Sequence, residues 1–217
     1  LNPKNTLQAL NKYYNFTLLR KERVAGRVCN VIAIIPKDHF RYGYRLWIDV
    51  ESSHLLRNDI VNNQGQVVEQ MMFTSIKFFQ VAPKMNSQIE QNTSFAKMQS
   101  SPLAAIEAAN QVKWKAGPRQ IHWRMDLPPG FFLAEHDEGQ NPKDVFEHMV
   151  FTDGIASISV FIERQPSQKP TLRQAVSQGA INAMAWNKDK FGQVTVVGEV
   201  PQATVTKIAN SLHHTGP

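Results

Sequence analysis

The sequence predicts an α+β fold, mostly antiparallel β, in which a first sheet is followed by a smaller unit of strands and one closing helix. Residues 13–79 contain short runs of alternating or continuous apolar side chains, separated by turn signals at intervals of about ten residues. Residues 113–217 contain further runs of the same kind and then a stretch with the apolar spacing of a helix. Strands that come first and a helix that comes last are typical of the α+β class.

The strands of the first sheet are expected to follow one another as an antiparallel meander. Two of them alternate apolar with polar side chains, which is typical of a sheet with one buried face. A third, over residues 28–35, is nearly continuous in apolar and β-branched side chains, and Pro36 ends it. The turn Asn62–Gly65 separates the last two strands. The strand candidates are residues 14–18, 28–35, 42–48, 55–61 and 67–76.

Residues 80–112 differ in character from the strands before them. Gln, Asn, Ser, Ala and Met dominate, and no strand period is present. Ser101 and Pro102 favour the start of a short helix that runs to Asn110, because serine caps helices and proline suits their first position. The sequence therefore predicts three parts: a β domain over residues 1–79, a linker with some helix over 80–112, and a small α+β domain over 113–217.

The strands of the second unit are expected to pair through tight turns. The turn of residues 128–130 precedes one strand, and Asp153 with Gly154 forms a hairpin turn. Apolar side chains recur at helical spacing after Pro201, which predicts an amphipathic helix that packs on the sheet. The strand candidates are residues 120–125, 131–135, 147–151, 155–163 and 193–200, and the apolar helix positions are Val205, Ile208, Ala209 and Leu212.

Composition and charge place few limits on function. The 217 residues are 42% hydrophobic and 19% charged, which excludes a disordered or fibrous chain. The net charge of +6 favours anionic partners, although a charge of this size also serves solubility alone. The single cysteine, Cys29, cannot form an internal disulfide, and its strand-like surroundings predict a buried thiol. No stretch approaches the roughly 20 apolar residues of a membrane span.

The sequence contains no pattern typical of an enzyme. Phosphate-binding glycine motifs and the nucleophile elbow of hydrolases do not occur. The adjacent His213 and His214 diverge on a helix, so they are expected at its solvated C-terminal end rather than in a metal site. The close carboxylates Asp49 and Glu51 are explained by a strand end. We therefore expect no catalytic residue, no metal and no cofactor.

One cluster of cations and indoles differs from the rest of the sequence. Interleaved positive and aromatic side chains suit an anionic amphiphile, because cations pair with acidic groups while indoles cover apolar surface. An ordinary surface beside a buried Trp123 would give the same pattern, and the residues alone leave both interpretations open. The candidate contacts to an anionic partner are Lys113, Trp114, Lys115, Arg119 and Arg124.

The first sheet is also rich in aromatic and methionine side chains. A curved sheet that carries such side chains on its inner face can hold an acyl chain, because flexible thioethers adapt to irregular apolar ligands. An ordinary core has the same composition, and periodicity does not separate the two. The candidate lipid contacts are Tyr42, Tyr44, Trp47, Met71 and Phe73.

Several strings along the chain carry a resemblance to a known family. In the first part these are residues 23–27 (RVAGR), 31–34 (VIAI), 41–49 (RYGYRLWID) and 72–74 (MFT). In the second part they are residues 127–131 (LPPGF), 148–154 (HMVFTDG), 157–163 (SISVFIE), 179–180 (GA) and 194–201 (VTVVGEVP). Together, and in this order, they resemble the RseB/MucB family, regulators of the envelope-stress sigma factor.

The resemblance implies a fold and a function that the residues alone do not establish. It implies a first domain similar to the lipoprotein carriers LolA and LolB, an open β-barrel with an apolar cavity, followed by the smaller α+β domain. It implies a periplasmic regulatory protein, not an enzyme, that binds the periplasmic segment of a membrane-anchored anti-sigma factor. It also implies that binding protects that segment from proteolysis, and that lipopolysaccharide or another lipid releases it during envelope stress.

Two alternatives stay open. A periplasmic lipid or lipoprotein carrier would use the same first domain, although carriers of the LolA type lack an equivalent of the second. An enzyme with an unrecognised site is the other alternative. Exposed strand edges also favour a homo-oligomer, because they favour pairing between chains. Nucleic acid is not an expected partner. The family's chain begins well before the region that matches Tyr13, so the resemblance also predicts that the family's N-terminal part is missing here.

Overall fold

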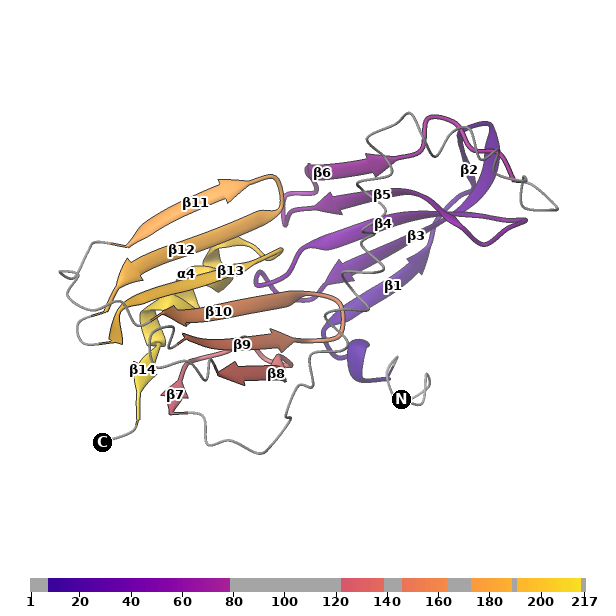
Figure 1. The fold of residues 1–217 in the computed structure, drawn as a ribbon. Helices are drawn as coiled ribbons and strands as arrows, with labels where there is room; N and C mark the ends of the chain where they lie inside the picture. The colour runs from indigo at the N-terminus through magenta and orange to yellow at the C-terminus, as the bar shows by residue number, and fades with distance from the viewer. Residues whose placement is uncertain (1–7, 79–121, 139–145, 164–172, 189–190, 216–217) are drawn as a thin grey trace, which may run out of the picture. The chain divides into compact units, whose positions relative to one another are not determined.

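A computed structural model of the chain describes residues 8–78, 122–138, 146–163, 173–188 and 191–215. Most of the regular structure in these residues consists of antiparallel strands (Figure 1). The prediction of a mostly antiparallel β fold is therefore confirmed. No helix in the described part of the chain is long and apolar enough to cross a membrane.

The first sheet contains a strand at each of the five positions expected over residues 13–79 and one further strand, β2, that was not expected. They are β1 (Tyr14–Leu18), β2 (Glu22–Val24), β3 (Arg27–Pro36), β4 (Gly43–Asp49), β5 (Leu55–Val61) and β6 (Val67–Met72). β3, β4, β5 and β6 form a meander, while β1 and β2 both pair with β3. Within the described residues β1 and β6 do not pair with each other, so the sheet is open rather than closed into a barrel.

The continuous apolar run of strand β3 places apolar side chains on both of its faces. Cys29, Val31 and Ala33 share one buried face, while Ile32 and Ile34 on the other face are half-buried. This alternation follows from the strand geometry, in which successive side chains point to opposite faces. Burial, followed by the nearby Asp49 carboxylate, raises the pKa of the Cys29 thiol. The thiol therefore stays protonated and unreactive, as the sequence predicts.

The second sheet follows in the chain and is also antiparallel. Its strands are β8 (Phe132–Glu138), β9 (Phe146–Thr152), β10 (Ser157–Glu163), β11 (Gln174–Gln178), β12 (Ile181–Asn187) and β13 (Gln193–Gly198). Their order in the sheet is β11-β12-β13-β10-β9-β8. The strands β7 (Trp123–Arg124) and β14 (His213–His214) form a separate two-stranded pair.

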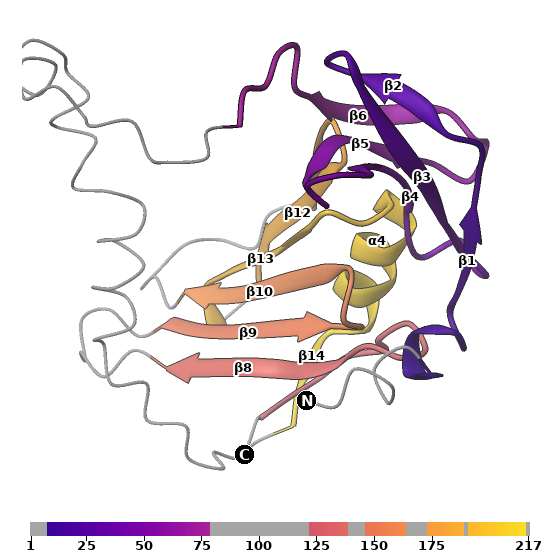
Figure 2. The same cartoon turned by 90° about the vertical axis from the view of Figure 1, so that its right-hand side faces the viewer.

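The main core lies between the second sheet and the helix α4 (Gln202–Ser211), which packs against β12 and β13 (Figure 2). The helix buries Val205, Ile208 and Ala209, three of the four positions that the helical spacing selected. Strand β10 alternates strictly, with Ile158 and Val160 fully buried. The predicted amphipathic helix on a small sheet is therefore confirmed.

Two parts of the second unit differ from the sequence prediction. β11 and β12 were not expected as strands. His213 and His214 were expected at the end of the helix, but α4 ends at Ser211 and the two histidines pair with β7. The expected linker of residues 80–112 lies outside the described residues, and the three-part division remains a prediction.

The stability of the fold is expected to depend on pH through the carboxyl group of Asp49. Its Oδ2 atom accepts hydrogen bonds from Arg27 at 2.8 Å and from the Ser52 hydroxyl at 2.5 Å. These bonds, that from Arg27 first, lower the pKa of Asp49. A carboxyl whose folded pKa lies below its unfolded value of about 3.9 stabilises the fold above about pH 4, and loses that contribution as pH falls further.

We therefore expect Asp49→Asn to flatten the loss of stability below about pH 4. Urea unfolding across a pH series measures this. The matched control is Asp126→Asn, at an exposed position, which should lose stability at low pH as the parent does. Parallel loss of stability in the parent and in Asp49→Asn would contradict the expectation.

Candidate functional site

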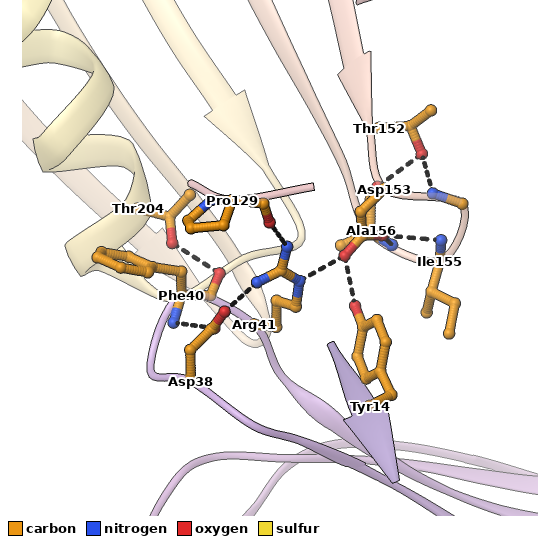
Figure 3. A network of polar contacts seen from close by, with 11 residues as sticks. Tyr14, Asp38, Phe40, Arg41, Pro129, Thr152, Asp153, Ile155, Ala156 and Thr204 are labelled. Atoms are coloured by element: carbon orange, nitrogen blue, oxygen red, sulfur yellow. Dashed lines mark hydrogen bonds and ion pairs between the residues drawn. The ribbon is translucent and has the colours of Figure 1, made fainter. Parts of the chain in front are cut away.

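Polar contacts join the two sheets along a line that we call the seam, and Figure 3 shows the part of it around Arg41 and Asp153. Each contact is a hydrogen bond between a residue of the first sheet or its turns and a residue of the second sheet, its turns or α4. At least one of the two residues contributes a polar side chain. The seam consists of Tyr14, Phe40, Arg41, Tyr42, Tyr44 and Glu69 on the first side and of Pro129, Asp153, Ala180, Asn182, Glu199 and Thr204 on the second. These contacts lie within one compact unit, made of residues 1–75 and 120–217.

Arg41 is the centre of the seam. Its side chain is 0% exposed, and so is that of Asp153, whose Oδ2 atom accepts a hydrogen bond from Arg41 Nε at 2.5 Å. The other two guanidinium nitrogens donate to Asp38 and to the backbone carbonyl of Pro129. Every nitrogen of a buried cation thus has a partner, which buried charges require.

Asp153 serves both sheets at once. Its Oδ1 atom accepts hydrogen bonds from the backbone N–H groups of Ile155 at 2.9 Å and Ala156 at 2.8 Å, which closes the predicted hairpin turn. Its Oδ2 atom also accepts the Tyr14 hydroxyl proton at 2.8 Å. Burial, followed by the Asp153 charge, raises the pKa of Tyr14, so the hydroxyl stays protonated and remains a donor.

The turn before β8 also touches the first sheet's side of the seam. Gly130 has a φ of +89°, and a Cβ atom there would lie 2.3 Å from the Tyr13 ring. The left-handed backbone and the close ring together require glycine. The Tyr13 ring centroid lies 4.8 Å from the Arg41 guanidinium, and the Phe131 ring lies at 5.0 Å. Aromatic rings at this distance attract a cation.

A second group of contacts extends the seam along β4 and β12. The Tyr42 hydroxyl accepts from Asn182 at 3.0 Å, and the Tyr44 hydroxyl donates to Glu199 at 3.0 Å. Burial, followed by the Glu199 charge, raises the pKa of Tyr44. The backbone N–H of Ala180 donates to Glu69 at 3.1 Å.

A cavity of about 630 Å³ opens at the end of the first sheet, where β3, β4 and β5 meet their turns. Most of its wall is apolar and includes Ile35, Pro36 and Val61. Lys37, Asp38 and Arg45 also line it, and the Asp38 carboxylate is paired with Arg41. Its volume lies within the range of about 300–1,000 Å³ that is typical of small-molecule sites. The cavity therefore suits a ligand with an apolar body and an anionic group.

The five predicted lipid contacts do not lie together. Tyr42 and Tyr44 are buried against the second sheet, and Tyr44 lines the cavity as well. Trp47 is buried, donates from Nε1 to Glu22 at 2.9 Å, and lies 4.1 Å from the Arg57 guanidinium. Met71 and Phe73 are exposed by 55% and 45%. A role in lipid binding for these residues remains a prediction.

Most of the basic and aromatic cluster lies outside the described residues, namely Lys113, Trp114, Lys115 and Arg119. Arg124 is exposed on β7, opposite His213. Trp123 beside it is buried in the main core and donates from Nε1 to Glu147 at 2.8 Å. Among the described residues no three His, Cys, Asp or Glu side chains converge as a metal site requires.

Comparison with known proteins decides the family. The model of the MucB/RseB N-terminal domain matches residues 2–99, and the model of the MucB/RseB C-terminal domain matches residues 117–213. The chain belongs to the MucB/RseB family. Both domains of the family are thus present in order, and their matches cover most of the chain.

Curated members of the MucB/RseB family align along nearly the whole chain. The sigma factor AlgU regulatory protein MucB of Pseudomonas aeruginosa is 32% identical over 211 residues, which cover 94% of this chain and 61% of that protein. The sigma-E factor regulatory protein RseB of Escherichia coli K12 is 27% identical over 208 residues, which cover 94% of this chain and 60% of that protein. The chain therefore spans about 60% of the length of these relatives.

Solved structures of MucB show the same fold. MucB in complex with MucA(peri) has a TM-score of 0.69 and 28% identity, over 96% of this chain and 70% of that one. The Pseudomonas aeruginosa MucA/MucB complex has a TM-score of 0.70 and 28% identity, over 96% of this chain and 67% of that one. A crystal structure of MucB has a TM-score of 0.55 and 27% identity, over 95% and 65%.

Proposed function

We propose that this chain acts in the periplasm as a regulatory binding protein for the periplasmic segment of a membrane-anchored anti-sigma factor. Binding would protect that segment from proteolysis, and lipopolysaccharide or another lipid would release it. The observation that carries the proposal is the likeness to MucB in complex with MucA(peri), which extends over 96% of this chain and so includes both sheets. The relatives are named as regulatory proteins, which supports binding rather than catalysis.

The proposal predicts direct binding to an anti-sigma segment. We expect the purified chain to bind the MucA periplasmic segment with a Kd of about 1 μM or tighter, which corresponds to about −8 kcal/mol. Isothermal titration calorimetry measures the affinity, and a segment of the same composition in scrambled order is the control. Equal heats for the two peptides would overturn the proposal.

The lipid part of the proposal rests on the cavity at the end of the first sheet. Its apolar wall offers burial to an acyl chain, and each buried methylene contributes about 0.8 kcal/mol. Lys37 and Arg45 offer positive charge to a phosphate or carboxylate at the same site. Lipid A and free fatty acids share this chemistry, an apolar chain with an anionic head.

We expect Ile35→Glu to weaken lipid binding by about tenfold or more, because it places a carboxylate in the apolar wall beside an anionic ligand. Ile35 is 50% exposed, so the fold should tolerate the change. The matched control is Val176→Glu, at a 63% exposed position of β11 outside the cavity. Displacement of a fluorescent fatty acid by lipopolysaccharide or by oleate measures the affinity for each source. Equal affinities of the two variants would exclude this cavity as the lipid site.

A further inference from the structure

The buried contact between Arg41 and Asp153 depends on the arrangement of the two sheets. The Oδ1 atom of Asp153 binds backbone N–H groups of its own turn, and those bonds need the second sheet alone. Its Oδ2 atom binds Arg41 and Tyr14, both of which belong to the first sheet and its turns. One oxygen of the Asp153 carboxylate therefore closes a turn of the second sheet. The hydrogen bonds of its other oxygen depend on where the first sheet lies.

The contact is directional rather than a general source of affinity between the sheets. Two charges that are 0% exposed lose their hydration when they meet, so the gain from pairing is largely offset by desolvation. A planar guanidinium, in contrast, donates hydrogen bonds only along its fixed N–H directions. Arg41 uses these directions for Asp38, Pro129 and Asp153, so a change in sheet arrangement would break the set.

The comparison structures differ from this chain by different amounts. The TM-score is 0.69 and 0.70 for MucB in the two structures with MucA, and 0.55 for MucB in the third structure. Coverage of this chain is 96%, 96% and 95%, so the length of chain aligned is nearly the same in all three.

We propose that the Arg41–Asp153 contact is a latch that holds the two sheets in the arrangement that binds the anti-sigma segment. The latch rests on the proposed function, because it regulates that binding site. Arg41 and Asp153 are positioning residues in this role, since both side chains are 0% exposed. A chain that spends only about one tenth of its time latched would bind about tenfold more weakly.

Asp153→Asn tests the latch with little change of shape. The asparagine oxygen can still accept from the turn N–H groups, whereas its amide nitrogen faces Arg41 and Tyr14 as a donor. Tyr14→Phe is a milder second variant that removes one hydroxyl. The matched control is Asp126→Asn, which makes the same chemical change at an exposed position outside the seam.

The arrangement and the affinity are measured separately on the full chain. Spin labels at Lys21→Cys, between β1 and β2 of the first sheet, and at Val176→Cys, on β11 of the second sheet, report the distance between the sheets once the buried Cys29 is changed to Ala. We expect the distance distribution to broaden in Asp153→Asn and Tyr14→Phe, and the Kd for the MucA periplasmic segment to rise by about tenfold in Asp153→Asn. Asp126→Asn should match the parent in both.

Each outcome has a separate meaning. An unchanged distance distribution in Asp153→Asn would overturn the latch, whatever the affinity. A broadened distribution with an unchanged Kd would overturn its control of binding. If the parent itself does not bind the segment, the proposed function fails, whereas the distances still decide whether Arg41 and Asp153 hold the sheets together.

Discussion

Replacing Arg41 with leucine is expected to lower the free energy of unfolding by about 3–5 kcal/mol, the cost typical of removing one partner from a buried ion pair. The variant removes a side chain that is 0% exposed and leaves the equally buried Asp153 without its cation. It also leaves the Pro129 carbonyl without its donor. Urea unfolding followed by circular dichroism measures the change.

The control for this prediction is Arg20→Leu. Arg20 also pairs with a carboxylate, Glu22 at 3.4 Å, but its side chain is 87% exposed. Exposed pairs contribute about 0–1 kcal/mol, so the variant should unfold nearly like the parent. A loss of less than about 1 kcal/mol in Arg41→Leu would show that the buried pair is not needed for the fold.

Replacing Ile208 with alanine is expected to cost about 2–5 kcal/mol of unfolding free energy. Ile208 is fully buried between α4 and the second sheet, so the variant loses apolar burial and leaves a cavity in a closely packed core. The same urea experiment measures the loss.

Gln202→Ala, at an exposed position of the same helix, is the matched control for Ile208→Ala and should change stability by less than about 0.5 kcal/mol. Equal effects of the two variants would show that helix propensity, and not packing on the sheet, limits the stability of α4. A loss in Ile208→Ala alone would support the assignment of the main core.

The sequence predicts the strands whose apolar positions coincide with a buried face. β10 is the clearest case, since its Ile158, Val160 and Ile162 alternate with outward positions and all three are buried. β12 was missed because its first two positions reverse the pattern expected of a strand, with a polar residue buried and an apolar one exposed. Asn182 points inward and Ile181 is 49% exposed, so the binary pattern conflicts with the strand. Asn182 is buried because its amide bonds Tyr42 and the Val200 carbonyl, which no local pattern shows.

The candidate site was harder to predict than the fold. Tyr42 and Tyr44 alternate as a lipid-facing strand would, yet they pack and bond against the second sheet. No role was predicted for Arg41 beside them, because its partner Asp153 lies 112 positions further along the chain. Burial of a charge depends on such distant partners, and composition and spacing within one strand carry no information about them.

The long sequence separations in the seam have a consequence for the order of folding. Its contacts join residues that lie between 88 and 164 positions apart, so each closes a long loop. Strands within each sheet meet through shorter loops and are favoured to form first. We therefore expect the seam to assemble after the transition state, so that weakening it speeds unfolding and leaves the refolding rate unchanged. On this expectation the lifetime of the folded protein, more than its rate of formation, depends on Arg41 and Asp153.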